Sequence, residues 1–280
     1  MRSDINYSKI IDSDEARKAQ QAADRAPNMP SAAIDTQKFY ITQHYDRYTA
    51  ENHEVWSTMW KRRMATLKDQ ASKVFLEGLE AINLTPDRVP KVEDVNARLR
   101  PLTGWQSRPV PGYLPGKAFF ACLAHRQFPT TITVRPKELM EYLPEPDIFH
   151  DVFGHVPLHA DPVFAEFLQT YGRAALQAES AYHVERLGRL FWFTVEFGLI
   201  REDGRTKLYG SGLISSISES EHALRSPHVD RRPFDLDRVC ETPFEIDHFQ
   251  PILYVLESFE QLRDAMNKYA QRVLNEAKAA

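Results

Sequence analysis

Cysteine is scarce in this chain of 280 residues, which has only Cys122 and Cys240. They are too far apart for a Cys-x-x-Cys pair, and two thiols exclude a disulfide framework. Long hydrophobic runs are also missing, since no stretch approaches the roughly eighteen apolar residues of a membrane-spanning helix. The first residues, MRSDINYSKI, lack the apolar core of a secretory signal. We therefore expect a cytoplasmic protein that has no membrane partner.

An excess of charge of either sign is absent as well. The sequence has 35 basic and 39 acidic residues, which gives a formal net charge of -4. Its basic runs, such as 61–63 and 231–232, are short and are typical of solvated surface. This charge pattern excludes an electrostatic stripe for nucleic acid. The length is sufficient for a sizeable core.

Hydrophobic periodicity predicts a mainly helical fold. Residues 1–34 are polar and contain Pro27 and Pro30, so we expect a mobile N-terminal tail with at most one weak helix, followed by a single domain over residues 35–280. Apolar residues three and four apart predict helices over 49–67, 74–82, 92–99, 119–126, 163–176, 180–199 and 251–273. We also expect a loop over 101–115, a strand over 130–135, a hairpin at Asp203-Gly204, and a small-residue strand or loop over 209–216.

The stretch PDIFHDVFGHVPLHADP is the richest in imidazole and carboxylate groups. His150 and His155 are five residues apart, so on a straight helix they would point roughly 140° apart. Gly154 and Pro157 favour an end or a deformation of the helix between them, which would let the two rings converge. Imidazoles on one rigid turn suit Fe, Zn, Cu or Ni. At this point a metal site and a structural role are equally supported, and His159 alone is more typical of a core residue.

Glu196 lies in the apolar run FWFTVEFG. A carboxylate buried there without a partner would cost several kcal/mol, so it needs a cation, a proton or a metal. It could equally face solvent or pair with Arg189 or Arg201. Combined with His150 and His155 it forms the two-histidine, one-carboxylate triad of non-haem Fe(II) oxygenases, which leaves open positions for dioxygen and a second reactant.

Three segments in this order resemble the pterin-dependent aromatic amino acid hydroxylases: EPDIFHDVFGHVPL, WFTVEFGL and YGSGLISS. The resemblance is greatest to the bacterial members that hydroxylate phenylalanine and have a catalytic domain alone. It implies a mainly α fold, a basket of helices around a non-haem iron with a few short β-strands. It also implies conversion of L-phenylalanine to L-tyrosine with dioxygen, Fe(II) and tetrahydrobiopterin or a related tetrahydropterin. The regulatory and tetramerisation segments of the animal members are not matched, so we expect a monomer.

The resemblance also implies roles for individual residues. It makes His150, His155 and Glu196 the Fe(II) ligands and names no other catalytic residue. The implied substrate-binding residues are Arg135, Leu143, Pro144, Trp192, Phe197, Gly212 and Ser215. The implied pterin-binding residues are Gly112, Leu114, Phe119 and Asp151. A guanidinium suits a carboxylate, and aromatic faces suit an aryl group and a pterin. Leu143, Phe149 and Asp151 depart from the pattern of the animal members, which affects contacts more than chemistry.

Three alternatives stay open from the sequence alone. The chain could be a tyrosine or tryptophan hydroxylase of the same family, because specificity depends on pocket shape. It could be a zinc-dependent hydrolase that uses the histidine pair, with Glu196 as a ligand and Asp151 as a base. It could also be a non-enzymatic helical binding protein in which the histidine-rich turn is structural.

Overall fold

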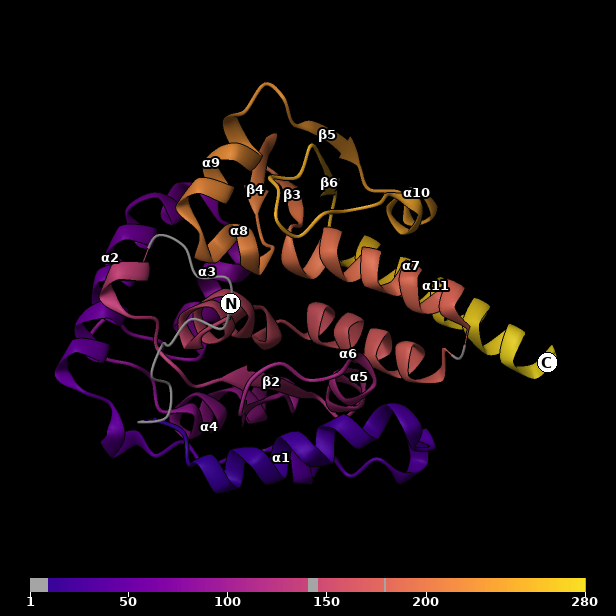
Figure 1. The fold of residues 1–280 in the computed structure, drawn as a ribbon. Coiled ribbons are helices and arrows are strands. Elements are labelled where there is room, and N and C mark those ends of the chain that lie inside the picture. Colours follow the sequence, from indigo (N-terminus) through magenta and orange to yellow (C-terminus); the bar gives the residue numbers. More distant parts are fainter. Residues whose placement is uncertain (1–9, 141–145, 179, 280) are drawn as a thin grey trace.

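Helices dominate the computed structural model, as the periodicity predicts, and the model describes residues 10–140, 146–178 and 180–279 (Figure 1). The α-helices are α1 (Ser13–Arg25), α2 (Ala50–Gln70), α3 (Lys73–Ala81), α4 (Val92–Thr103), α5 (Gly116–Ala124), α6 (Pro162–Gln177), α7 (Ala181–Phe191), α8 (Ser211–Ser215), α9 (Ile217–Arg225), α10 (Leu236–Glu241) and α11 (Phe259–Ala279). Two segments are π-helical, η7 (Phe149–His155) and η9 (Trp192–Glu196). The short 3₁₀ turns are η2 (Ala26–Asn28), η3 (Ser31–Ala33), η4 (Thr36–Phe39), η5 (Tyr45–Arg47), η6 (Lys137–Leu139) and η8 (Val156–Ala160).

The strands form two small sheets. They are β1 (Gln106–Val110), β2 (Gln127–Thr131), β3 (Leu199–Glu202), β4 (Arg205–Leu208), β5 (Asp230–Pro233) and β6 (Ile252–Leu256). Strands β1 and β2 pair in parallel, and the second sheet has the order β4-β3-β6-β5. The hairpin between β3 and β4 is confirmed, with Asp203 and Gly204 at φ 49° and 72° in its turn. The four-stranded sheet lies at one end of the molecule with α9 and α10 beside it, and α1 lies at the opposite end (Figure 1).

Helix α6 occupies the centre of the core between α5 and α11. Its start is well defined, because Asp161 accepts a hydrogen bond from the backbone N–H of Phe164 at 2.8 Å and Pro162 occupies the first turn. Its inward side chains Phe164, Phe167 and Tyr171 are fully buried. Within the described ranges, none of the helices combines the length and the apolarity needed to span a bilayer.

The helix predicted over 251–273 is wrong in its first third. Residues Ile252–Leu256 form the inner strand β6, and α11 begins only at Phe259. β6 pairs in parallel with both β3 and β5, and four of its five residues are buried. A strand covered on both faces is a continuous apolar run, so periodicity cannot distinguish it from the start of a buried helix.

Three other expected segments also differ. The loop expected over 101–115 contains the end of α4 and strand β1, where Pro109 is tolerated because β1 is an edge strand. The strand over 130–135 lies earlier, at Gln127–Thr131. Residues 211–215 form the short helix α8 rather than a strand or loop.

The described part of the expected N-terminal tail is helical and packed. Asp12 caps α1 by accepting the backbone N–H groups of Asp14 and Glu15, each at 3.0 Å. Ala23 and other small residues of this segment are buried in a cluster that extends across β1 and α5. Ala23 and Ala26 let this segment pack against α5, mainly through η2, while the polar outer face of α1 is typical of a solvated tail. The single domain over residues 35–280 stays a prediction.

Two glycines let the chain pass very close behind Glu196. A Cβ atom on Gly198 would lie 2.0 Å from Cζ of Tyr209, and one on Gly210 would lie 2.5 Å from the Glu196 carbonyl oxygen. The N–H groups of Tyr209 and Gly210 both donate to the Gly198 carbonyl, at 3.2 and 3.0 Å. This crossing places the start of α8 directly against the end of η9.

We predict opposite effects for two glycine-to-alanine substitutions. Gly210→Ala should lower the free energy of unfolding by about 1–3 kcal/mol or more, because the added methyl group overlaps backbone atoms. Gly188→Ala, within α7, should raise it by about 0.5–1 kcal/mol, because its Cβ would meet nothing within 4 Å and alanine favours a helix. Urea denaturation measures both values. Equal stability of the two variants would contradict the close crossing.

Candidate metal centre

The two histidines converge because the segment that carries them is π-helical. Its hydrogen bonds connect residues five apart, so His150 and His155 lie on the same face. Their ring centroids are 5.0 Å apart and the ring planes are at 88°. The deformation expected from the sequence is confirmed, although the helix widens between the histidines instead of ending there.

Glu196 approaches the same point from a second π-helical segment. In η9 the N–H of Phe197 donates to the carbonyl of Trp192 at 2.8 Å, five residues back, and Glu196 faces the histidines. Its Oε1 lies 3.1 Å from Nε2 of His150, and its Oε2 lies 3.2 Å from Nε2 of His155.

The sequence alternatives for Glu196 are not observed. Arg189 pairs with Glu185, and Arg201 lies 3.5 Å from Glu257. Glu196 itself is largely buried, with 15% of its side chain exposed. The carboxylate is therefore directed inward, where one ligand atom from each member of the triad lies within 4.8 Å of the others.

Burial and charge act against each other in this centre. Burial alone would raise the pKa of Glu196, but the adjacent imidazoles His150 and His155 outweigh it and hold that pKa well below its usual range. Burial opposes protonation of His150, yet the Glu196 carboxylate, with Asp151 and Asp147 nearby, raises the pKa of His150 to about 9. The pocket therefore favours positive charge beside the carboxylate, and a divalent cation would supply it.

The hydrogen bonds of Ser215 orient His150 as a metal ligand requires. Ser215 Oγ donates its one hydrogen to the Ser211 carbonyl at 2.8 Å, so toward His150 Nδ1, at 2.9 Å, it is an acceptor. Nδ1 then carries a hydrogen, which leaves Nε2 as the ring nitrogen that can lose its proton and bind a metal. Two imidazole nitrogens and a carboxylate oxygen, oriented in this way, fit an iron ion.

Arg135 and Asp147 form a buried ion pair beside the histidines. Nε and Nη2 of Arg135 donate to the two carboxylate oxygens at 2.8 and 2.9 Å, and Asp147 is fully buried. Asp147 also accepts the backbone N–H groups of Arg135 and His150, each at 3.0 Å. Burial would raise the pKa of Asp147, but the Arg135 guanidinium lowers it. The pair thus connects the expected substrate-binding arginine to the first turn of η7.

The residues expected around the substrate lie close to Glu196 where the structure describes them. Trp192 packs against Phe197 at 4.7 Å between ring centroids and stacks on Phe244 at 4.5 Å. A Cβ on Gly212 would lie 3.0 Å from Cζ of Phe197, so a larger residue would require the Phe197 ring to shift by a few tenths of an ångström. Leu143 and Pro144 lie outside the described residues.

The residues expected around the pterin are more dispersed. Phe119 contacts Phe128, whose ring is 4.7 Å from that of His155, so a single ring separates Phe119 from His155. Asp151 accepts both the backbone N–H and the hydroxyl of Thr131, at 2.7 and 2.6 Å, and burial raises its pKa.

The two other residues expected around the pterin, Leu114 and Gly112, have surroundings unlike those of Phe119 and Asp151. Leu114 is buried in the cluster beneath α1 and α5, and a Cβ at Gly112 would have open space around it.

His159 is a core residue, as expected, fully buried and stacked on Trp105 at 4.8 Å.

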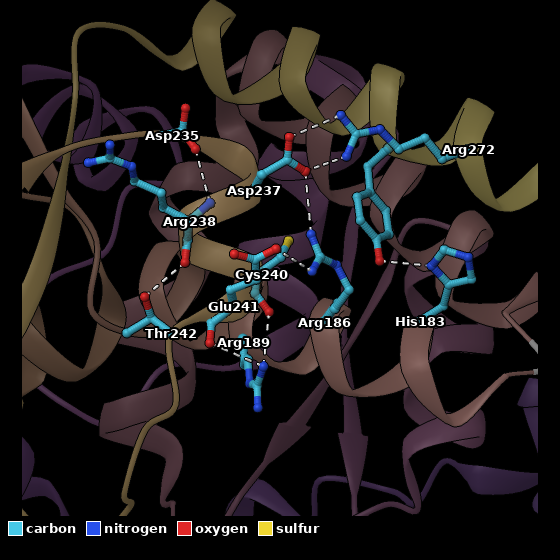
Figure 2. Close-up of polar contacts among 11 residues, drawn as sticks. His183, Arg186, Arg189, Asp235, Asp237, Arg238, Cys240, Glu241, Thr242 and Arg272 are labelled. Carbon is cyan, nitrogen blue, oxygen red and sulfur yellow. Dashed lines mark hydrogen bonds and ion pairs between the residues drawn. The ribbon is translucent and has the colours of Figure 1, made fainter.

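Helix α7, which leads directly into η9, is held by polar contacts with α10 and α11 (Figure 2). Arg186 donates to Asp237 and Glu241 at 3.3 Å each. Arg272 of α11 reaches the same Asp237, and His183 lies 2.9 Å from the hydroxyl of Tyr269. These contacts place the residues that precede Glu196.

Two contributors to the centre are not identified from the sequence. Ser211 Oγ lies 2.5 Å from Glu196 Oε2, and Arg63 of α2 donates to the carbonyls of Leu213 and Ile214 at 3.2 and 2.7 Å. The four-residue spacing of Ser211 and Ser215 is the signal that could have placed both hydroxyls on one side of α8. Nothing near Arg63 in the sequence indicates its partners.

Comparison with known proteins identifies the family. The sequence of residues 25–279 matches the family model of the biopterin-dependent aromatic amino acid hydroxylases. The chain therefore belongs to this family, and the hydrolase and binding-protein alternatives lose their support. The mainly helical fold with a few short strands is that of the family's catalytic domain.

Individual relatives agree with this assignment. Phenylalanine-4-hydroxylase of Chromobacterium violaceum is 44% identical over 82% of this chain and 78% of that protein. Its crystal structure with bound iron(III) and the oxidized cofactor 7,8-dihydrobiopterin superimposes with a TM-score of 0.81 at 41% identity, over 91% of this chain and 92% of that one. Tyrosine 3-monooxygenase of Rattus norvegicus is 38% identical, over 81% of this chain and 46% of that protein.

We predict that Asp147→Asn lowers the free energy of unfolding by about 3–5 kcal/mol, because it leaves the Arg135 guanidinium buried beside a neutral group. Asp230→Asn is the matched control. Asp230 pairs with Arg232 at 2.7 Å on the surface, so its substitution should change stability little. Urea denaturation compares the two variants, and a small loss for Asp147→Asn would mean that the pair is not a structural connection.

Proposed function

We propose that this protein is a phenylalanine 4-monooxygenase, which hydroxylates L-phenylalanine to L-tyrosine with dioxygen, a tetrahydropterin and Fe(II). The observation that carries the proposal is the convergence of His150, His155 and Glu196 from two π-helical segments. The family match and the phenylalanine-4-hydroxylase relatives support the same reaction. Tetrahydrobiopterin or a related tetrahydropterin is the proposed cofactor.

The protein's own residues have a limited task in this reaction. Iron and pterin, when bound, would supply the activation of dioxygen. His150, His155 and Glu196 hold the metal, and Ser215 keeps Nδ1 of His150 protonated. The aromatic side chains around them exclude bulk water and direct the substrate ring toward the metal. No side chain is assigned as an essential general base.

Substrate and pterin are assigned to two different sets of residues around the triad. We assign Arg135 to the substrate carboxylate. Its two hydrogen bonds to Asp147 hold the guanidinium in a fixed orientation. The substrate ring would lie against Trp192 and Phe197, beside Gly212. Leu143 and Pro144 belong to this assignment from sequence resemblance alone.

The proposed pterin site is built around Phe119. Its ring is the stacking surface of the proposed site, because it reaches the ligand His155 through a single intervening ring. Asp151, held by Thr131, is the acidic group on this side, and Gly112 and Leu114 complete the set.

A tyrosine or tryptophan hydroxylase is the alternative within the family, since the same triad serves all three reactions. The resemblance to tyrosine 3-monooxygenase is more distant than that to the phenylalanine enzyme. We further propose a cytoplasmic location, in keeping with two buried free thiols, and a monomeric state.

The first test uses metal-stripped protein incubated with Fe(II), L-phenylalanine, a tetrahydropterin and air, with chromatographic measurement of tyrosine. We expect tyrosine only when all four are present. Matched reactions that each omit one component are the controls. Formation of tyrosine without pterin would contradict the proposed reaction. Turnover of tryptophan or tyrosine in place of phenylalanine would instead make the protein a tryptophan or tyrosine hydroxylase of the same family.

Glu196→Gln tests the carboxylate ligand. An amide carries no charge and binds a metal weakly, so the affinity for Fe(II) should fall by more than about tenfold. Anaerobic equilibrium dialysis measures the affinity, and circular dichroism verifies the fold. Glu77→Gln, an exposed glutamate of α3, is the control and should bind as the wild type does. Unchanged affinity in Glu196→Gln would remove Glu196 from the metal centre.

A further inference from the structure

The side chain of Ser211 contacts two members of the proposed metal triad at their ligand atoms. Its Oγ lies 2.5 Å from Oε2 of Glu196 and 2.9 Å from Nε2 of His155, and the residue is 1% exposed. This differs from Ser215, which contacts Nδ1 of His150, the ring nitrogen that faces away from the triad. Ser211 therefore contacts the proposed ligand atoms themselves.

Hydrogen-bond chemistry defines the direction of these contacts. Ser211 Oγ donates its single hydrogen to Oε2 of Glu196, because a carboxylate that binds a metal can only accept. The lone pairs of Oγ then face Nε2 of His155. The contact with Glu196 can persist when Nε2 binds a metal, because the serine hydrogen is already directed to the carboxylate.

The backbone holds Ser211 in this position from several sides. A Cβ on Gly154 would lie 3.2 Å from Cβ of Ser211, so η7 presses directly against it. The Ser211 carbonyl accepts the hydroxyl of Ser215 at 2.8 Å. At the other end of α8, Arg63 donates to two carbonyls and is only 2% exposed. A helix fixed at both ends gives the hydroxyl little freedom to turn away.

We propose that Ser211 is a positioning residue of the metal centre, which holds the Glu196 carboxylate in the rotation that directs one oxygen to each histidine. The inference rests on the proposed function, because it requires His150, His155 and Glu196 to bind a metal. Without the hydroxyl the carboxylate could rotate, and part of the metal-binding free energy would be used to order it. Residues that orient metal ligands in this way typically contribute 10–100-fold to affinity.

The test is the binding of Co(II) to metal-stripped protein, measured by titration calorimetry and by visible absorption of the bound ion. We expect Ser211→Ala to bind Co(II) about 10–100-fold more weakly than the wild type, with a changed absorption spectrum at saturation. Ser218→Ala is the matched control, since Ser218 is exposed and contacts only Ser216 among the described hydrogen bonds. It should match the wild type in both measurements.

Two further measurements keep the result interpretable. Circular dichroism and urea denaturation of the metal-free variants separate loss of metal affinity from loss of fold. Ser211→Thr keeps a hydroxyl and should retain most of the affinity that Ser211→Ala loses. Equal affinity and spectra for Ser211→Ala and Ser218→Ala would overturn the positioning role of Ser211 and would leave the proposed metal centre intact. Failure of the wild type to bind Co(II) would instead overturn the proposed metal centre, and this inference with it.

Discussion

The buried carboxylate of Glu196 is the constraint on which the rest of the structure depends. It lies in an aromatic run, where an unpaired charge would cost several kcal/mol. The fold offsets this cost by directing His150, His155 and Ser211 at its two oxygens. The two histidines come from η7 and the serine comes from α8, so η7, η9 and α8 all meet at this one side chain.

The buried ion pair of Asp147 and Arg135 has a similar role at the start of η7. Asp147 is fully buried, and its oxygens accept from the Arg135 guanidinium and from the first turn of the histidine segment. The pair therefore fixes the start of η7 in the way that α10 and α11 fix α7 ahead of η9 (Figure 2). Both π-helical segments are held at their first residues, which leaves the π-helical turns themselves to present His150, His155 and Glu196.

The sequence predicts the amphipathic helices well, because one face of α2 or α6 is apolar at helical spacing. It fails for β6 and α8, whose structure depends on partners elsewhere in the chain: β6 is a strand only because β3 and β5 cover its edges. The histidine pair and Glu196 can be selected as ligands from their chemistry and from family resemblance. Arg63 cannot, since its partners are about 150 residues away and no local pattern indicates them. The spacing of Ser211 and Ser215 can place both hydroxyls on one side of α8, but it does not indicate that Ser211 contacts Glu196.

The placement of β6 has a consequence for the order in which this protein forms during synthesis. Leu199, three residues after Glu196, pairs with Val255 in a parallel ladder, and such long-range pairings form late because a large loop must first close. The strand that follows Glu196 therefore stays unpaired on that side until residue 255 has left the ribosome. The histidines are translated early, but their third partner becomes fixed only near the end of the chain. The geometry of the proposed metal centre is thus completed among the last parts of the fold.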